Sequence, residues 1–93
     1  MRRIPLSIGR HAPTEAKHYA LVDNDDYKTL RKFAWTFRAL KKRGGYAYRV
    51  RYGETILMHR QIMVAGLNET VTHKDKNGLN NQRLNLIKHT GET

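Results

Sequence analysis

The hydrophobic and polar positions change period several times along this chain, which predicts a mixture of strands and helices. Residues 1–17 have no sustained period and read as an N-terminal arm, with a short strand at 4–8. Residues 18–22 (H-Y-A-L-V) are a strand candidate. The acidic stretch that follows favours a helix over 25–33.

That helix would start at an N-cap of Asn24 or Asp25. Three strand candidates follow it, at 35–40, 46–52 and 55–58. The second of them alternates strictly, with Tyr or Val at even positions and Ala or Arg at odd positions. We therefore expect a three-stranded antiparallel sheet that packs on the helix.

The last third of the chain predicts a helix over 59–64, a loop over 65–69, a strand over 70–74 and a helix over 80–88. The expected fold class is α+β, in one domain over 1–93. It would consist of the arm, the basic sheet with its packed helix, and a smaller strand-and-helix unit that begins at residue 55.

The charge balance narrows the partners. The formal net charge is +10 on 93 residues, which favours nucleic acid first and an anionic membrane surface second. The chain has no cysteine, so disulfides and cysteine zinc sites are excluded, and a reducing cytoplasm is compatible. No apolar run reaches transmembrane length, and no signal peptide is expected.

The basic residues concentrate in the expected sheet. Eight Lys or Arg residues and no acid lie between Arg31 and Arg51. One sheet face with arginines and a basic turn could bind duplex DNA. The alternative is a polar face that only contacts solvent and has no binding role. The candidate nucleic-acid-binding residues are Arg38, Lys41, Lys42, Arg43, Arg49 and Arg51.

The aromatic residues of the same strands allow two interpretations. They could stack on unpaired bases, or they could form the buried side of the sheet, opposite the arginines. We expect the buried role. These residues are Trp35, Phe37, Tyr46, Tyr48 and Tyr52.

The most specific pattern lies between Met58 and Leu86. It reads M-H-R-Q-I-M and then V-T-H-K-D-K-N-G-L-N-N-Q-R-L-N-L. A strand delivers His73, a tight turn follows, and an Asn-rich segment carries Asn85. This stretch resembles the HNH nucleases of phages and intron homing endonucleases. The sheet before it, over roughly 19–51, is similar to the three-stranded Apetala-type DNA-binding domain.

The resemblance implies a ββα-metal unit that acts on duplex DNA in the cytoplasm of a bacterial host, encoded by a phage or mobile element. In that family the residue at His73 is the general base for water attack on phosphorus. A divalent ion (Mg²⁺, Mn²⁺ or Zn²⁺) polarises the phosphate. Asn85 matches the Asn that orients the loop with the His. His59 could be a second catalytic His, but the resemblance gives it a structural role.

The chain departs from the family pattern at the metal ligands. Thr72 stands where the family has its metal-binding Asp, and the second ligand would fall about nine residues past Asn85. A substitute site could form from His73, Asp75 and His89, because His89 would lie one helical turn after Asn85. Otherwise the site binds without cutting.

Three functions therefore remain. The first is an HNH-like DNA-binding protein in which cleavage is weak or lost. The second is a non-enzymatic binder, either a DNA-binding regulator or a phage inhibitor of a host nucleoprotein complex, as anti-CRISPR proteins are. The third is a basic RNA-binding protein. So small a domain would recognise a long site only as a dimer, with further domains, or with low specificity.

Overall fold

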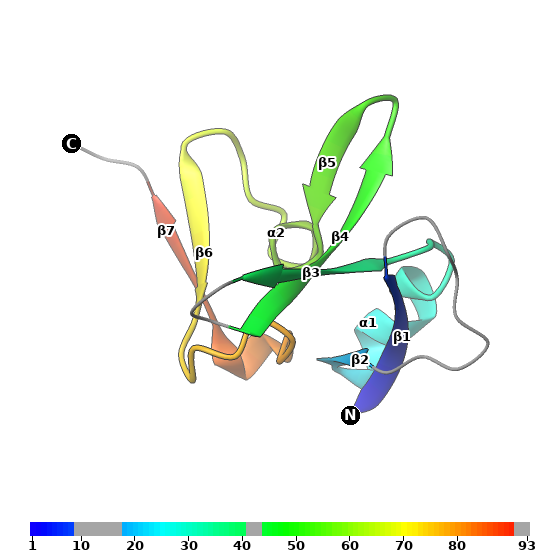
Figure 1. Ribbon diagram of the computed structural model, residues 1–93. Helices are drawn as coiled ribbons and strands as arrows, with labels where there is room; N and C mark the ends of the chain where they lie inside the picture. The colour runs from blue at the N-terminus through cyan, green and yellow to red at the C-terminus, as the bar shows by residue number, and fades with distance from the viewer. Residues whose placement is uncertain (9–17, 41–43, 91–93) are drawn as a thin grey trace.

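The computed structural model describes residues 1–8, 18–40 and 44–90 and has an α+β fold with two sheets (Figure 1). The larger sheet has five strands in the order β2-β1-β3-β4-β5, and the smaller pairs β6 with β7. The elements are β1 (Arg2–Ile8), β2 (His18–Val22), α1 (Asn24–Leu30), β3 (Thr36–Leu40), β4 (Gly44–Arg51), β5 (Glu54–Leu57), α2 (Met58–Ile62), β6 (Glu69–His73), the 3₁₀ turn η1 (Arg83–Asn85) and β7 (Leu86–Thr90).

The N-terminal segment is part of the large sheet. We expected an arm with a strand over 4–8, but β1 runs from Arg2 and pairs with β2 antiparallel. Its end pairs with β3 in parallel, at Ser7 with Thr36. The sheet is therefore mixed and five-stranded, and the expected antiparallel three-stranded sheet is only its β3-β4-β5 part. Side chains alternate between the two faces of β1, since Ile4 and Leu6 are buried whereas Arg3 and Pro5 are exposed.

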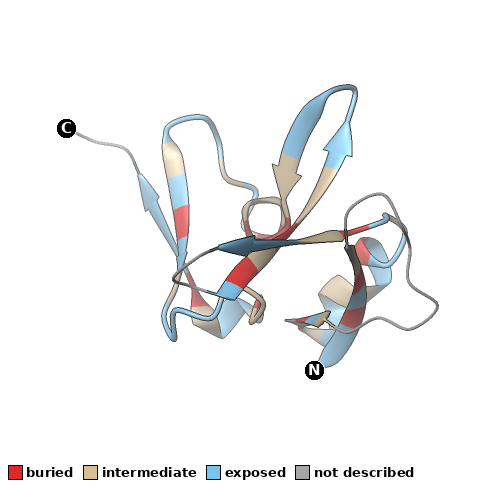
Figure 2. Ribbon diagram, viewed as in Figure 1, coloured by how far each residue is buried: buried red, intermediate tan, exposed pale blue. Residues whose placement is uncertain are grey.

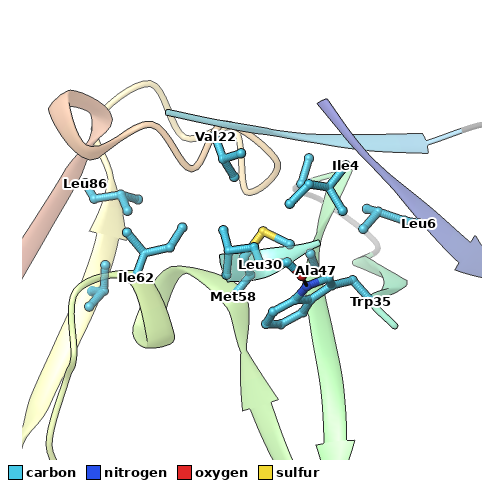
Figure 3. Packing of buried hydrophobic residues seen from close by; sticks show 11 residues of the cluster. Ile4, Leu6, Val22, Leu30, Trp35, Ala47, Met58, Ile62 and Leu86 are labelled. Carbon is cyan, nitrogen blue, oxygen red and sulfur yellow. Dashed lines mark hydrogen bonds between the residues drawn. The ribbon is translucent and has the colours of Figure 1, made fainter. Parts of the chain in front are cut away.

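The core lies between the large sheet and the two helices and extends to the small sheet (Figure 3). Trp35 is buried and its indole Nε1 donates a hydrogen bond of 2.8 Å to the carbonyl oxygen of Leu30, which ties the end of α1 to the start of β3. Met58 begins α2 directly after β5 and is fully buried. The cluster consists of Ile4, Leu6, Ala20, Val22, Leu30, Trp35, Ala47, Met58, Ile62, Val71 and Leu86.

The expected helix over 80–88 is wrong. A single 3₁₀ turn occupies Arg83–Asn85, and β7 then pairs antiparallel with β6, with Leu86 opposite His73. Strand pairing explains the difference, because residues 86–90 satisfy their backbone groups against β6 along its whole length and not within a helix. The residues before them form two successive Asx turns, in which the side chains of Asp75 and Asn77 accept hydrogen bonds from the backbone N–H groups two residues on.

The β6-β7 loop docks on the edge strand β2 of the large sheet. The backbone N–H of Leu21 donates to the carbonyl of Leu79 at 2.7 Å, and the N–H of Asn81 donates to the carbonyl of Leu21 at 2.7 Å. Nearby, the guanidinium of Arg83 makes two hydrogen bonds of 2.9 Å to the Asp26 carboxylate of α1. These contacts hold the small sheet against the strand β2.

Neither α1 nor α2, the two α-helices in the described part of the chain, has the length and apolarity that a membrane crossing requires.

Gly78 offers a test of a second close approach, between the β6-β7 loop and the β3-β4 hairpin. A Cβ atom at Gly78 would collide with the backbone carbonyl of Gly45. We expect Gly78→Ala to destabilise the fold by about 1–3 kcal/mol, since backbone cannot yield as a flexible side chain does. Urea unfolding measures this.

Gly66→Ala is the matched control, because its Cβ would meet only the end of the Glu69 side chain, at 3.4 Å. Its unfolding free energy should stay within about 0.5 kcal/mol of wild type. Equal effects of the two substitutions would contradict the close backbone approach.

Candidate functional site around His73

His73 ends β6 and lines an open hollow of about 610 Å³. One part of the lining is apolar, from Leu40, Tyr46 and Val71, and another is polar, with Lys76 at the turn after β6. The remaining lining residues are Gly45, His59, Thr72 and Gly78. Exposed lysines at 74 and 76 make this turn basic. The hollow thus combines the imidazole of His73, the ammonium group of Lys76 and an apolar wall.

A fully buried amide orients the His73 ring. Asn81 is 0% exposed, and its Oδ1 lies 2.6 Å from Nε2 of His73. An amide oxygen can only accept, so Nε2 donates to it, and in the neutral form of the ring Nδ1 then carries the lone pair. A neutral imidazole fixed in one tautomer can take a proton through Nδ1, which suits a general base.

His59 lies against the same ring. The two imidazole centroids are 4.7 Å apart, with the ring planes at 62°. Burial, and after it the neighbouring His73 and Arg60, lower the pKa of His59 from 6.5 to about 4. His59 is therefore neutral at neutral pH. Its Nδ1 and the Nδ2 of Asn81 are the buried side-chain atoms in the described residues that have no hydrogen-bond partner.

The turn after His73 is held by Asp75 and Asn85. The Asn85 side chain donates to Asp75 Oδ1 at 2.8 Å and accepts from the Asp75 backbone N–H at 3.1 Å. Asn80 donates to the other carboxylate oxygen at 2.9 Å. Hydrogen bonds from Asn80, the Asn77 backbone and Asn85 lower the pKa of the Asp75 carboxyl. Asn85 thus lies in the loop that carries His73, but on a 3₁₀ turn and not on a helix.

The substitute metal site does not assemble. His89 faces Thr70 across the hairpin, and its Nε2 lies 3.0 Å from the Thr72 hydroxyl. Since side chains alternate along a strand, Thr72 and His73 point to opposite faces, and His89 is on the Thr72 side. In the described residues, no three His, Cys, Asp or Glu side chains gather as metal ligands would. The donor set around His73 therefore does not fit a divalent ion.

The basic sheet differs from the expected one-sided face. Arg38 of β3 pairs with Tyr46 of β4, so these two side chains share one face of the sheet. Arg49 is two residues after buried Ala47 and therefore lies on the Ala47 face, which is the other one. Arg38 and Arg49 therefore lie on opposite faces. The Arg49 guanidinium packs 3.9 Å from the Phe33 ring centroid, and its Nε donates to Gln61 at 3.0 Å, so Arg49 is structural.

Other residues of the expected interface vary in their placement. Arg38 and Arg51 are exposed, while Lys41, Lys42 and Arg43 lie outside the described residues. Of the aromatics, Trp35 is buried as expected, and Phe37, Tyr46 and Tyr48 are half-buried. Tyr52 is 92% exposed, which corrects its expected place in the core.

Sequence reasoning missed Asn81 as a site residue and left His59 with a structural role. The expected helix put Asn81 within its first turn, where Asn side chains usually face water or cap. The signal that could have found it is the Asn-Asn pair just after a Lys-Asn-Gly turn, where an Asn side chain can fold back on the preceding strand.

Comparison of the sequence and the fold with known protein families, curated proteins and solved structures gives no match.

Removal of the Asn81 amide should release the His73 tautomer. In Asn81→Leu the ring has no acceptor at Nε2, so we expect a mixture of the two neutral tautomers in place of one. Long-range ¹H–¹⁵N NMR spectra of the imidazoles measure this, with His89 of the same sample as an internal reference. A single unchanged His73 tautomer in the variant would show that Asn81 does not set it.

The low pKa of His59 predicts loss of stability in mild acid. The unfolded chain takes up a proton near pH 6.5 and the folded chain only near pH 4, so unfolding takes up protons in between. The free energy of unfolding has its full value above pH 6.5 and falls by on the order of 3 kcal/mol as the pH drops to 4. The pKa of Asp75 is lowered in the folded chain, so protonation of this carboxyl removes further stability at lower pH.

Urea unfolding between pH 7 and pH 4 measures this slope. His59→Leu should remove most of it, since no proton is then taken up at this position. A variant with the wild-type slope would assign the acid sensitivity to other groups.

Proposed function

We propose that the chain is an HNH-nuclease-like protein that binds duplex DNA at the surface around His73, with hydrolysis weak or lost. The observation that carries the proposal is the His73 ring, fixed by buried Asn81 at the wall of an open hollow beside exposed lysines. The net charge of +10 supplies the attraction for a phosphate backbone. The Met58–Leu86 motif supports the same proposal from sequence.

The chemistry available to the described residues is limited. Nδ1 of His73 can accept the proton of a water molecule that attacks phosphorus, and Lys74 or Lys76 can hold a phosphate oxygen. In the family a divalent ion stabilises the leaving oxygen. Thr72 is hydrogen-bonded to His89, and the Asp75 carboxylate is hydrogen-bonded to three groups of its own loop. The described residues therefore do not supply that ion's ligands. Binding is therefore the activity that we propose first.

A second candidate is a nuclease-derived binder that docks on a host nucleoprotein complex in the cytoplasm, as an anti-CRISPR protein does. The lack of a converging metal-ligand set among the described residues favours it over an efficient nuclease. A partner retained from host lysate after nuclease digestion would support this candidate over direct DNA binding.

Two assays on one DNA separate these functions. Retardation of supercoiled and linear duplex at low salt tests binding, and we expect retardation that weakens as salt rises. Nicking of the same plasmid is then measured with Mg²⁺, Mn²⁺, Ni²⁺ or Zn²⁺, for wild type, His73→Ala and Thr72→Asp. We expect little or no nicking by wild type.

The outcomes decide between the candidates. Metal-dependent nicking that His73→Ala abolishes would mean a working nuclease. A gain in Thr72→Asp alone would mean a scaffold that lost its metal ligand. Failure of wild type to retard any duplex at low salt would overturn the DNA-binding proposal.

A further inference from the structure

The β4-β5 hairpin carries a strained residue at its tip. Arg51 pairs with Glu54, so Tyr52 and Gly53 form a two-residue loop, and their φ angles are +49° and +80°. Positive φ at both positions defines a type I′ turn, for which Asn-Gly or Asp-Gly is the preferred sequence. A tyrosine at the first position is therefore unfavourable for the turn itself.

No packing of the Tyr52 side chain against the rest of the protein offsets this strain. The side chain of Tyr52 is 92% exposed, and Val50 on the strand before it is 60% exposed. The Arg51 guanidinium lies 5.3 Å from the Tyr52 ring centroid and is exposed as well. The hairpin projects from the rest of the molecule, and its tip is exposed on both strands (Figures 1 and 2). An aromatic ring held in this way is placed for an external partner.

We propose that the β4-β5 hairpin enters a groove of duplex DNA and that Tyr52 contacts the bases there, a contact that rests on the DNA-binding function proposed above. The major groove admits a two-stranded β-ribbon, and an apolar or aromatic side chain can contact the base edges there, above all the thymine methyl group. The chain's charge of +10 favours a polyanion over a protein surface as the partner.

The local charge sets what the tip contributes. Glu54 lies opposite Arg51 and balances it, and Arg49 is turned inward onto Phe33. The tip is therefore close to neutral, and Tyr52 acts through its ring and not through phosphate attraction. Its loss should weaken binding without changing the slope of affinity against salt.

A matched pair of variants separates strain from function. Val64, after α2, has φ +50° and is 82% exposed, close to the values for Tyr52. Asn tolerates this conformation, so Tyr52→Asn and Val64→Asn relieve similar strain, and neither changes the charge. Both should melt at or slightly above the wild-type temperature. Tyr52→Phe keeps the ring and serves as the conservative variant.

Affinity for a fluorescent 20-base-pair duplex, measured by anisotropy over a salt series, tests the contact. We expect Tyr52→Asn to bind roughly tenfold more weakly, with Val64→Asn and Tyr52→Phe within about twofold of wild type. Wild-type affinity in Tyr52→Asn, with wild-type retardation intact, would overturn the tip contact alone and leave the tip for a protein partner. A wild-type chain that binds no duplex would overturn both this contact and the proposed function. Absence of nicking affects neither.

Discussion

The two hydrogen bonds between Leu21 and the β6-β7 loop are the constraint on which the rest of the structure depends. They join the small sheet to the edge strand β2, and they bring the Asn81 side chain into the interior, where it is 0% exposed. From there Asn81 reaches His73 at 2.6 Å. A backbone contact of the fold therefore decides the orientation and tautomer of the one histidine on which the candidate chemistry rests. The salt bridge from Arg83 to Asp26 reinforces the same docking from the exposed side.

The strands were largely predictable because their signal is local. The apolar run at 18–22 and the strict alternation in 46–52 predicted strands close to the observed bounds of β2 and β4. The strand β1 was only partly found, since its pairing with β3 is a contact across 29 residues that no local pattern encodes. The expected helix over 80–88 was wrong for the same reason. Residues 86–90 pair with β6, and the local apolar spacing does not encode that contact.

The basic sheet shows why charge predicts a partner better than it predicts a face. A net charge of +10 is a property of the whole chain, but the side that an arginine occupies depends on register. One strand pairing places Arg38 beside Tyr46, and strand alternation then puts Arg49 on the Ala47 side, where its stem and guanidinium cover Phe33. Long cationic side chains are adaptable enough to serve as core covering. The arginines of the sheet cannot therefore be counted as a single binding surface.

The unfavourable polar contacts of the described residues gather around one side chain. A buried nitrogen without a partner costs about 1–3 kcal/mol, and the two such atoms, in His59 and Asn81, belong to the residues that contact the His73 ring. A core selected only for stability would place apolar groups at both positions. Local rules are broken where a protein keeps an arrangement for its function, so this concentration favours His73 as the functional centre on grounds independent of the sequence motif. The loop after β6 does not point to a functional centre in this way, because the Asp75 carboxylate accepts its hydrogen bonds from neighbouring loop residues.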